Sequence, residues 1–248
     1  MTTVLRVLSY NVRSLRDDPA AVARVVRSCR PDVVCLQEAP RLLLWRTGRR
    51  RLARRCGLRI AAGRRPGGLE ILTAPGVVVE RRTHRLLRRH PRLHRRALST
   101  VLVRLGERRV AVAVSHLDLC ARARLEHAEQ ILAFLGAEAA PGVLAVDVNE
   151  EPGGAAWQLL AEHLVDAGAL GPSGGEPTFP ARRPRSRIDT VFVDRSLPVV
   201  TGGVPAQPSR EDLVAASDHL PVLVEIALEG DGEPRTPPVG QAAEEADG

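Results

Sequence analysis

Apolar residues recur along the chain in short runs rich in β-branched side chains, and such runs predict β-strands. Six runs stand out: VLRVLSY (4–10), DVVCL (32–36), VAVAVSHL (110–117), VLAVDV (143–148), IDTVFV (188–193) and PVLVEIAL (221–228). Several are apolar at almost every position, which is typical of strands buried on both faces. Residues 69–104 predict further consecutive strands joined by turns.

Three segments between these runs have the spacing of helices. Residues 19–29 place apolar side chains at helical intervals, with Asp18 as the N-cap and Pro19 in the first turn. Residues 121–136 predict a longer amphipathic helix, and residues 153–163 a shorter one. Helices that alternate with strands, together with runs of consecutive strands, predict α/β layers around a largely antiparallel core.

The chain of 248 residues predicts one domain followed by a tail. We assign the domain to residues 1–228 and expect residues 229–248 to be disordered, because this segment cannot bury apolar surface. Residues 171–187 (GPSGGEPTFPARRPRSR) predict a loop, and long loops of this kind often border an active site. No apolar run approaches the roughly 18 residues of a membrane span, and the first residues lack a signal-peptide pattern. We therefore expect a cytoplasmic monomer.

The net charge of +7 is a weak indication of a polyanionic partner. All 36 basic residues are Arg, and the absence of Lys favours codon bias as the source of much of the excess. The Arg-rich runs 46–55 and 81–96 are interpreted as solvated faces. Aromatic residues for base stacking are scarce, with one Tyr, two Trp and three Phe. Nucleic acid is one candidate partner among several.

Cysteines and most histidines lack the spacing of a metal or redox site. The cysteines are interpreted as small buried hydrophobic residues: Cys29, Cys35, Cys56 and Cys120. Five histidines lie in Arg-rich or helical segments and are expected to be solvated: His84, His90, His94, His127 and His163.

Acids, amides and histidines recur where the predicted strands end. They are Asn11, Glu38, His116, Asp147, Asn149, Asp189, Asp218 and His219. A polar side chain at the edge of a core costs free energy unless it is paired or liganded, so the recurrence predicts a shared polar cleft. Carboxylates are hard oxygen ligands, suited to Mg²⁺ or Mn²⁺ rather than zinc. Asp147 and Asn149 are two apart, so an extended backbone would point both to one face.

Six motifs carry a resemblance to a known family. SYNVR, LQE, SHLD, VDVNEEP, RIDTVFV and SDHLPV, in this order, resemble the endonuclease/exonuclease/phosphatase superfamily from about Leu5 to Glu225. The superfamily includes pancreatic-type deoxyribonucleases, abasic-site endonucleases, neutral sphingomyelinases and inositol polyphosphate 5-phosphatases. The resemblance implies a four-layered α/β/β/α sandwich of two central mixed, largely antiparallel sheets flanked by helices, with the site at one end. It also implies hydrolysis of phosphate esters with Mg²⁺ or Mn²⁺.

The resemblance implies a metal site. Glu38 in LQE would be the principal metal ligand, supported by Asn11 in SYN, and Asp218 in SDH would lie near the metal. The family's GDFN motif is VDVN here, so Val146 and Val148 replace a glycine and an aromatic residue at packing positions. The polar residues of that motif are kept.

The resemblance also implies the catalytic residues. His219 would be the catalytic histidine, held by Asp189 of the RID motif. Asp147 and Asn149 would orient the nucleophile and bind phosphate, and His116 would help to stabilise the transition state. The expected reaction is attack of water on phosphorus, with the Asp189–His219 pair and a Glu38-bound Mg²⁺.

Several alternatives stay open within this class. Abasic-site endonucleases carry a Tyr where this chain has His116 and a Trp where it has Ser186–Arg187, so both differences count against that activity. A phosphatase or a phospholipid or sphingolipid head-group phosphodiesterase is an alternative to a nuclease-like phosphodiesterase. A non-catalytic polyanion-binding protein is a further alternative, but it would require a degraded site.

Two single positions also stay open. Either Arg95 or Arg96 matches a phosphate-binding arginine that some members carry before the next strand. Glu70 either pairs with His116 or faces solvent from its strand.

Overall fold

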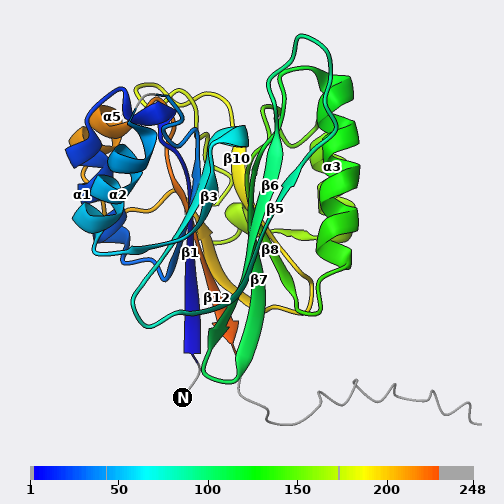
Figure 1. Cartoon of the computed structure of the whole chain (residues 1–248), viewed down its shortest axis with the longest axis horizontal. Helices are drawn as coiled ribbons and strands as arrows, with labels where there is room; N and C mark the ends of the chain where they lie inside the picture. Colours follow the sequence, from blue (N-terminus) through cyan, green and yellow to red (C-terminus); the bar gives the residue numbers. More distant parts are fainter. Residues whose placement is uncertain (1–2, 43, 173, 229–248) are drawn as a thin grey trace, which may run out of the picture.

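Two β-sheets pack face to face, and helices cover both outer faces, giving four layers (Figure 1). The structure is a computed structural model, and it describes residues 3–42, 44–172 and 174–228. The sandwich expected from the sequence is confirmed. The tail predicted to be disordered, residues 229–248, lies outside the described residues.

Each sheet has six strands. The first has the order β11-β12-β1-β2-β4-β3 and consists of β1 (Thr3–Asn11), β2 (Val33–Gln37), β3 (Arg59–Arg64), β4 (Leu69–Thr73), β11 (Val199–Gly203) and β12 (Val222–Leu228). The second has the order β5-β6-β7-β8-β10-β9 and consists of β5 (Val78–Leu86), β6 (Ala97–Leu105), β7 (Arg108–His116), β8 (Gly142–Asp147), β9 (Val165–Asp166) and β10 (Asp189–Val193).

The sheets are mixed, with one parallel pair each among the described strands. β1 runs parallel to β2, and β7 runs parallel to β8, whereas the other paired strands are antiparallel. A parallel connection needs a crossover, usually a helix. Helix α1 (Pro19–Cys29) makes the first crossover, and α3 (Ala121–Gly136) makes the second. These two pairs set the position of the candidate site.

The core follows the alternation of side chains on the strands. Residues such as Val7, Val33 and Val112 point between the sheets, where apolar side chains of both sheets meet. A second cluster lies between the first sheet and the helices α1, α2 (Trp45–Cys56) and α5 (Arg210–Ala216). A third lies between the second sheet and the helices α3 and α4 (Ala155–His163). Burial on both faces explains why these strands are nearly continuous apolar runs.

Local sequence signals account for α1. Asp18 lies in extended backbone, and its side chain accepts a hydrogen bond from the amide of Ala20 at 2.7 Å. This is the predicted N-cap, followed by Pro19 at the first helical position. The helices predicted at 121–136 and 153–163 are present as α3 and α4.

Helix α2 is a correction to the sequence analysis, which interpreted residues 46–55 as a solvated face only. The helix turns Leu52, Ala53 and Cys56 onto the first sheet, and it buries Arg49 as well. Its many arginines obscured this narrow apolar stripe. The short elements β3, β11 and α5 were also not predicted.

Two further expectations are wrong. Cys120 is exposed, whereas Cys29, Cys35 and Cys56 are buried as expected. His127 is buried rather than solvated, because α3 turns its ring inward and Nε2 lies 2.9 Å from the carbonyl oxygen of Arg88.

Candidate functional site

The candidate site forms where the two parallel strand pairs end. In the first sheet Asn11 at the end of β1 is in register with Gln37, the residue before Glu38. In the second sheet His116 at the end of β7 is in register with Asp147 at the end of β8. The carboxyl ends of parallel strands lie at the same edge of a sheet, and such edges commonly bind ligands. The packing of the two sheets brings both edges to one end of the molecule.

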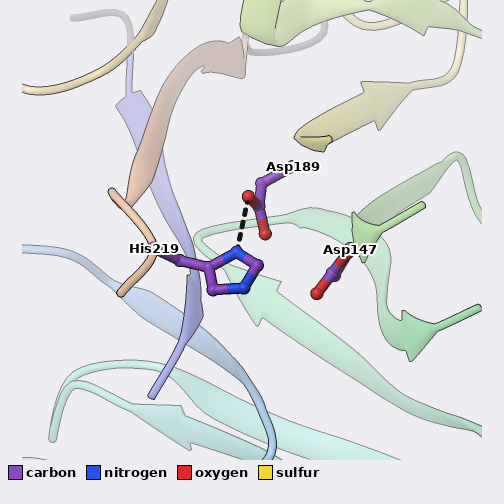
Figure 2. Close-up of side chains that lie close together, drawn as sticks. All are labelled: Asp147, Asp189 and His219. Carbon is purple, nitrogen blue, oxygen red and sulfur yellow. Dashed lines mark hydrogen bonds and ion pairs between the residues drawn. The ribbon is translucent and has the colours of Figure 1, made fainter. Parts of the chain in front are cut away.

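Three of the predicted residues form one cluster of possible metal-ligand atoms. Asp147, Asp189 and His219 are buried, and each offers a ligand atom within 4.8 Å of those of the other two. They come from different segments, since Asp189 begins β10 opposite Asp147 and His219 precedes β12. Figure 2 shows the His219 ring beside both carboxylates, with one nitrogen bonded to Asp189 and the other facing the side on which Asp147 lies.

Asp189 holds the His219 ring. Nδ1 of His219 donates to Oδ2 of Asp189 at 2.9 Å, and the hydroxyl of Thr178 donates to the same oxygen at 2.7 Å. Burial lowers the pKa of His219, but the charge and hydrogen bond of Asp189, together with Asp147 and Asp218, raise it to about 10. The imidazole is therefore protonated near neutral pH, with its Nε2–H free for a ligand.

Asp147 is fixed by two amide residues. Its Oδ2 accepts from Nδ2 of Asn11 at 2.8 Å, and its Oδ1 accepts from the backbone amide of Asn149 at 3.1 Å. Burial raises the pKa of Asp147, and the neighbouring Asp189 raises it further. Asp147 is thus a carboxylate with raised basicity, fixed in one orientation.

The spacing of Asp147 and Asn149 predicted an extended backbone that points both side chains to one face. The two residues do converge, but the backbone between them is not extended. Asn149 has φ of +57°, in the left-handed region that asparagine tolerates better than most residues. The chain turns there, and Nδ2 of Asn149 donates to the carbonyl of Leu117 at 3.0 Å and approaches Nε2 of His116 at 2.9 Å.

His116 is neutral in this setting. Its Nε2 accepts from Asn149 and lies 3.4 Å from Oδ2 of Asp147. Burial lowers its pKa to about 3, and Asp147 opposes this only in part. Asp147 therefore has two imidazole neighbours, the neutral ring of His116 and the charged ring of His219.

Glu38 lines a cavity of about 150 Å³ beside this cluster, together with His116, Asn149, Arg41 and Arg96. Glu38 has φ of +49°, a conformation that the surrounding backbone holds in place. Its carbonyl accepts from the amide of Ser14 at 2.8 Å. In the part of the chain that the structure describes, the Glu38 carboxylate has no hydrogen-bond or ion-pair partner.

Asp218 points to a different cavity from Glu38. Its Oδ2 lies 3.1 Å from Nε of Arg13, and it lines a cavity of about 710 Å³ with Arg13, Arg182, Arg183 and Arg185. The two cavities flank the Asp147–Asp189–His219 cluster. Of the predicted metal ligands, Glu38 therefore lines the smaller cavity, Asp218 lines the larger one, and Asn11 lies beside Asp147.

The residues fit a divalent cation at Glu38. An unpartnered carboxylate that lines a cavity is an oxygen donor of the kind that Mg²⁺ and Mn²⁺ favour. The Asp147–Asp189–His219 cluster fits a metal less well, because Nδ1 of His219 is bonded to Asp189 and its protonated ring has no free lone pair.

Sequence reasoning missed several residues of the site. Thr178 fixes Asp189, the ring of Phe179 packs on His219 with centroids 4.8 Å apart, and Ser217 donates to the carbonyl of Asn11 at 2.7 Å. Thr178 and Phe179 belong to the 171–187 loop, whose composition predicted only that it borders the site. Of the two candidate arginines, it is Arg96 that lines the Glu38 cavity, where its Nε lies 3.5 Å from Asp118.

Glu70 neither pairs with His116 nor faces solvent, which were the two alternatives for it. It is buried, with Arg49 of α2 as its nearest charge at 4.0 Å, and it does not pair with His116. Strand alternation turns Glu70 to the face of the first sheet that α2 covers.

The sequence comparison decides the family. The profile of the endonuclease/exonuclease/phosphatase family matches residues 8–219, which is most of the chain. The protein belongs to this family. No curated protein matches the sequence.

Solved structures of the endonuclease/exonuclease/phosphatase fold resemble the chain along most of its length. A conserved protein of Enterococcus faecalis V583, described as functionally unknown, is 24% identical with a TM-score of 0.76, over 91% of this chain and 100% of that one. The mannosyl-6-phosphatase Bt3783 of Bacteroides thetaiotaomicron VPI-5482 is 20% identical with a TM-score of 0.72, over 90% and 100%. The human Nocturnin catalytic domain, solved with a sulfate anion, is 15% identical with a TM-score of 0.69, over 91% and 97%. At these identities the likeness concerns the fold alone.

Proposed function

We propose that this protein is a divalent-metal-dependent hydrolase of phosphate esters that directs water at phosphorus. One observation carries the proposal: the Asp189-held imidazolium of His219 lies within 4.8 Å of Asp147, next to a cavity that contains the unpartnered carboxylate of Glu38. A protonated donor, a basic carboxylate and a cation ligand are the groups that hydrolysis of a phosphate ester needs.

Glu38 would hold the cation, with Asn11 close by. A bound Mg²⁺ or Mn²⁺ would neutralise charge that develops on the phosphoryl oxygens and the leaving group. Nδ2 of Asn11 already donates to Asp147, so Asn11 connects the cation ligand to the carboxylate that faces His219.

Asp147 would accept the proton of the attacking water as the ester P–O bond breaks, and the leaving oxygen would take up a proton from solvent. Its raised pKa makes it a better base than an exposed aspartate, and Asn11 and Asn149 keep it in one orientation. His219 would donate through Nε2–H to a phosphoryl oxygen, with Asp189 keeping the ring charged and aligned. His116 and Asn149 would line the other side of the phosphate, and Arg96 would contribute positive charge.

The intact site favours catalysis over the non-catalytic polyanion-binding alternative. Each of the catalytic residues predicted from the sequence lies at this end of the fold, and the Asp189–His219 pair has the geometry of a positioned acid. Two similar proteins point the same way: one is a mannosyl-6-phosphatase, and another was solved with a tetrahedral sulfate anion.

A substrate panel tests the proposal. Purified protein with Mg²⁺ or Mn²⁺ would be assayed on a chromogenic phosphodiester, a chromogenic phosphomonoester, plasmid DNA, RNA, sphingomyelin and inositol phosphates. We expect hydrolysis of at least one phosphate ester, its loss in excess EDTA and its recovery with Mg²⁺. The matched variant is His219→Asn. It should reduce the rate of hydrolysis by about 10²-fold or more, because it removes the charged donor to the phosphoryl oxygen. Turnover that neither EDTA nor His219→Asn affects would refute the proposal.

A further inference from the structure

Exposed leucines lie at the end of the molecule that contains the candidate active site. Leu42, Leu44 and Leu119 are 70%, 71% and 73% exposed. The six other exposed large apolar residues of the described chain range only from 38% to 57%. The most exposed apolar side chains are thus concentrated at one end of the molecule, although they contribute nothing to its core.

The leucines belong to two segments that follow strands of different sheets, beside the Glu38 cavity. Leu42 and Leu44 lie in the loop from Glu38 to α2, and Leu42 follows Arg41, which lines the Glu38 cavity. Leu119 lines the same cavity from the segment after β7. The two segments follow one strand of each parallel pair, so the apolar side chains come from both sheets at the end where the Glu38 cavity lies.

An aromatic residue stands beside them. Trp45 is half-buried at the first position of α2, and the guanidinium groups of Arg46 and Arg49 lie 5.0 Å and 4.8 Å from its ring centre. Leu44 and Trp45 also line a shallow cavity of about 370 Å³ with Pro40. Tryptophan with leucine neighbours is typical of segments that enter the interface of a lipid bilayer.

The same end is strongly basic. Arg182, Arg183 and Arg185 line the 710 Å³ cavity, and within the described part of the chain their guanidinium groups have no hydrogen bond or ion pair. Arg41 and Arg46 add charge around the leucines and are likewise without an acidic partner in the described residues. Acids at this end are partly neutralised, since Arg13 pairs with both Asp17 and Asp218.

We propose that the active-site end docks on an anionic lipid surface, with Leu42, Leu44 and Leu119 entering the bilayer interface and the arginines contacting lipid phosphates. Separate protruding leucines among guanidinium groups match the chemistry of such a surface, which offers an apolar layer beneath anionic head groups. None of the helices in the described residues is long and apolar enough to cross a membrane.

The inference rests on the proposed function and specifies its substrate class. A site that opens toward a lipid surface would act on phosphoester head groups presented there. The small Glu38 cavity would receive the scissile phosphate, and the larger arginine-lined cavity would receive the remainder of the head group or a neighbouring anionic lipid.

Vesicle co-sedimentation tests the docking surface. The full chain would be mixed with vesicles of phosphatidylcholine alone and with vesicles of equal parts phosphatidylcholine and phosphatidylglycerol. We expect partition to the anionic vesicles only, weakened by salt. The double variant Leu42→Asn/Leu44→Asn should lower that partition about tenfold or more. Asparagine suits position 44, where φ is +58°.

A matched control changes an apolar side chain at the far end. Val200→Asn alters a residue that is 57% exposed in β11, where β11 pairs with the Ile226 end of β12, away from His219. This variant should bind vesicles as the wild type does. Trp45 fluorescence should shift to the blue on binding, whereas Trp157 is already buried and should contribute no change. The docking surface would be overturned if Val200→Asn lowered the partition to anionic vesicles as much as Leu42→Asn/Leu44→Asn does. It would also be overturned if the wild type did not bind these vesicles.

Hydrolysis of a soluble chromogenic phosphodiester separates this inference from the proposed function. The Leu42→Asn/Leu44→Asn variant should keep the soluble rate and lose most of its rate on vesicle-borne lipid phosphodiester. Soluble hydrolysis without vesicle binding would overturn the docking surface alone. Vesicle binding that depends on the leucines, without hydrolysis of any phosphate ester, would support the docking surface and overturn the proposed function.

Discussion

The imidazole of His219 donates through Nδ1 to Asp189 across 2.9 Å, and the hydroxyl of Thr178 donates to the same carboxylate oxygen. This contact joins two segments 30 residues apart and leaves the second ring nitrogen facing the side of Asp147. Burial lowers the pKa of His219, but the carboxylate of Asp189 outweighs it and raises that pKa well above its usual value.

The first prediction concerns the charge of His219. In the metal-free protein its ring should stay protonated above pH 8, because its pKa is raised to about 10. Asp189→Asn should bring the titration down toward or below the usual value near 6.5, since burial then acts with less opposition. NMR of the histidine ring carbons measures this directly. His116 provides an internal comparison, because it should stay neutral down to about pH 4.

The same shift makes stability depend on pH. The folded protein holds the His219 proton more tightly than the unfolded chain, so this contribution to the free energy of unfolding is complete below about pH 6.5. It should be lost as the pH rises toward about 10, and Asp189→Asn should remove the dependence. A ring that titrates near 6.5 in both proteins would contradict the assigned pair.

The second prediction concerns the turn at Asn149. Asn149→Gly keeps a residue suited to φ of +57° but removes the side chain that contacts His116 and Leu117. Asn149→Ala removes the same contacts and adds backbone strain. We expect both variants to lose about 10²-fold in kcat and Ala to be less stable than Gly by about 1 kcal/mol. Chemical denaturation and initial rates measure the two effects, and equal stability of the two variants would exclude the strain.

The third prediction concerns Glu70, which is buried 4.0 Å from Arg49. Burial raises its pKa to about 7, and Arg49 opposes this only in part. The folded state therefore holds this proton more tightly than the unfolded chain, so its stabilising contribution is complete below about pH 4.5 and is lost as the pH rises through 7. Glu70→Gln should gain stability relative to the wild type over that range, by up to about 3 kcal/mol.

Denaturant unfolding at several pH values measures the Glu70 effect. Glu176→Gln changes an exposed acid in the 171–187 loop and should leave the pH dependence unchanged. Parallel stability curves for Glu70→Gln and the wild type would show that Glu70 is ionised in the folded protein at neutral pH.

Much of the fold could be predicted from the sequence, because the strands beside the site are buried on both faces. Residues 4–10 and 143–148 are nearly continuous apolar runs for that reason, and β1 and β8 lie where they were expected. The site residues were found because each polar residue lies at one end of such a run. Their roles as metal ligands and catalytic groups stay predictions.

Other features depend on tertiary contacts that a linear pattern does not show. Helix α2 buries only a narrow stripe, including Leu52 and Cys56, under a surface of arginines, so its sequence reads as solvated. The burial of Glu70 and Arg49 depends on how that helix covers the sheet. Thr178 reaches Asp189 from a loop whose composition carries no periodicity.

The turn at Asn149 shows a second limit. The spacing of Asp147 and Asn149 suggested one face of an extended strand, but β8 ends at Asp147 and the chain enters a left-handed turn. The side chains still converge, through the hydrogen bond from the Asn149 amide to Asp147. The two-residue spacing thus correctly predicted that Asp147 and Asn149 are neighbours, but the cause is a turn and not an extended strand.

The central claim is that Glu38 holds a divalent cation beside His219, and paramagnetic broadening by Mn²⁺ tests it most directly. We predict that stoichiometric Mn²⁺ broadens the ring resonances of His219 and His116 in the wild type and leaves those of His163, at the far end of α4, sharp. Glu38→Gln should abolish the broadening at the same Mn²⁺ concentration while the fold is kept. Sharp His219 resonances at saturating Mn²⁺, or broadening that persists in Glu38→Gln, would contradict the account.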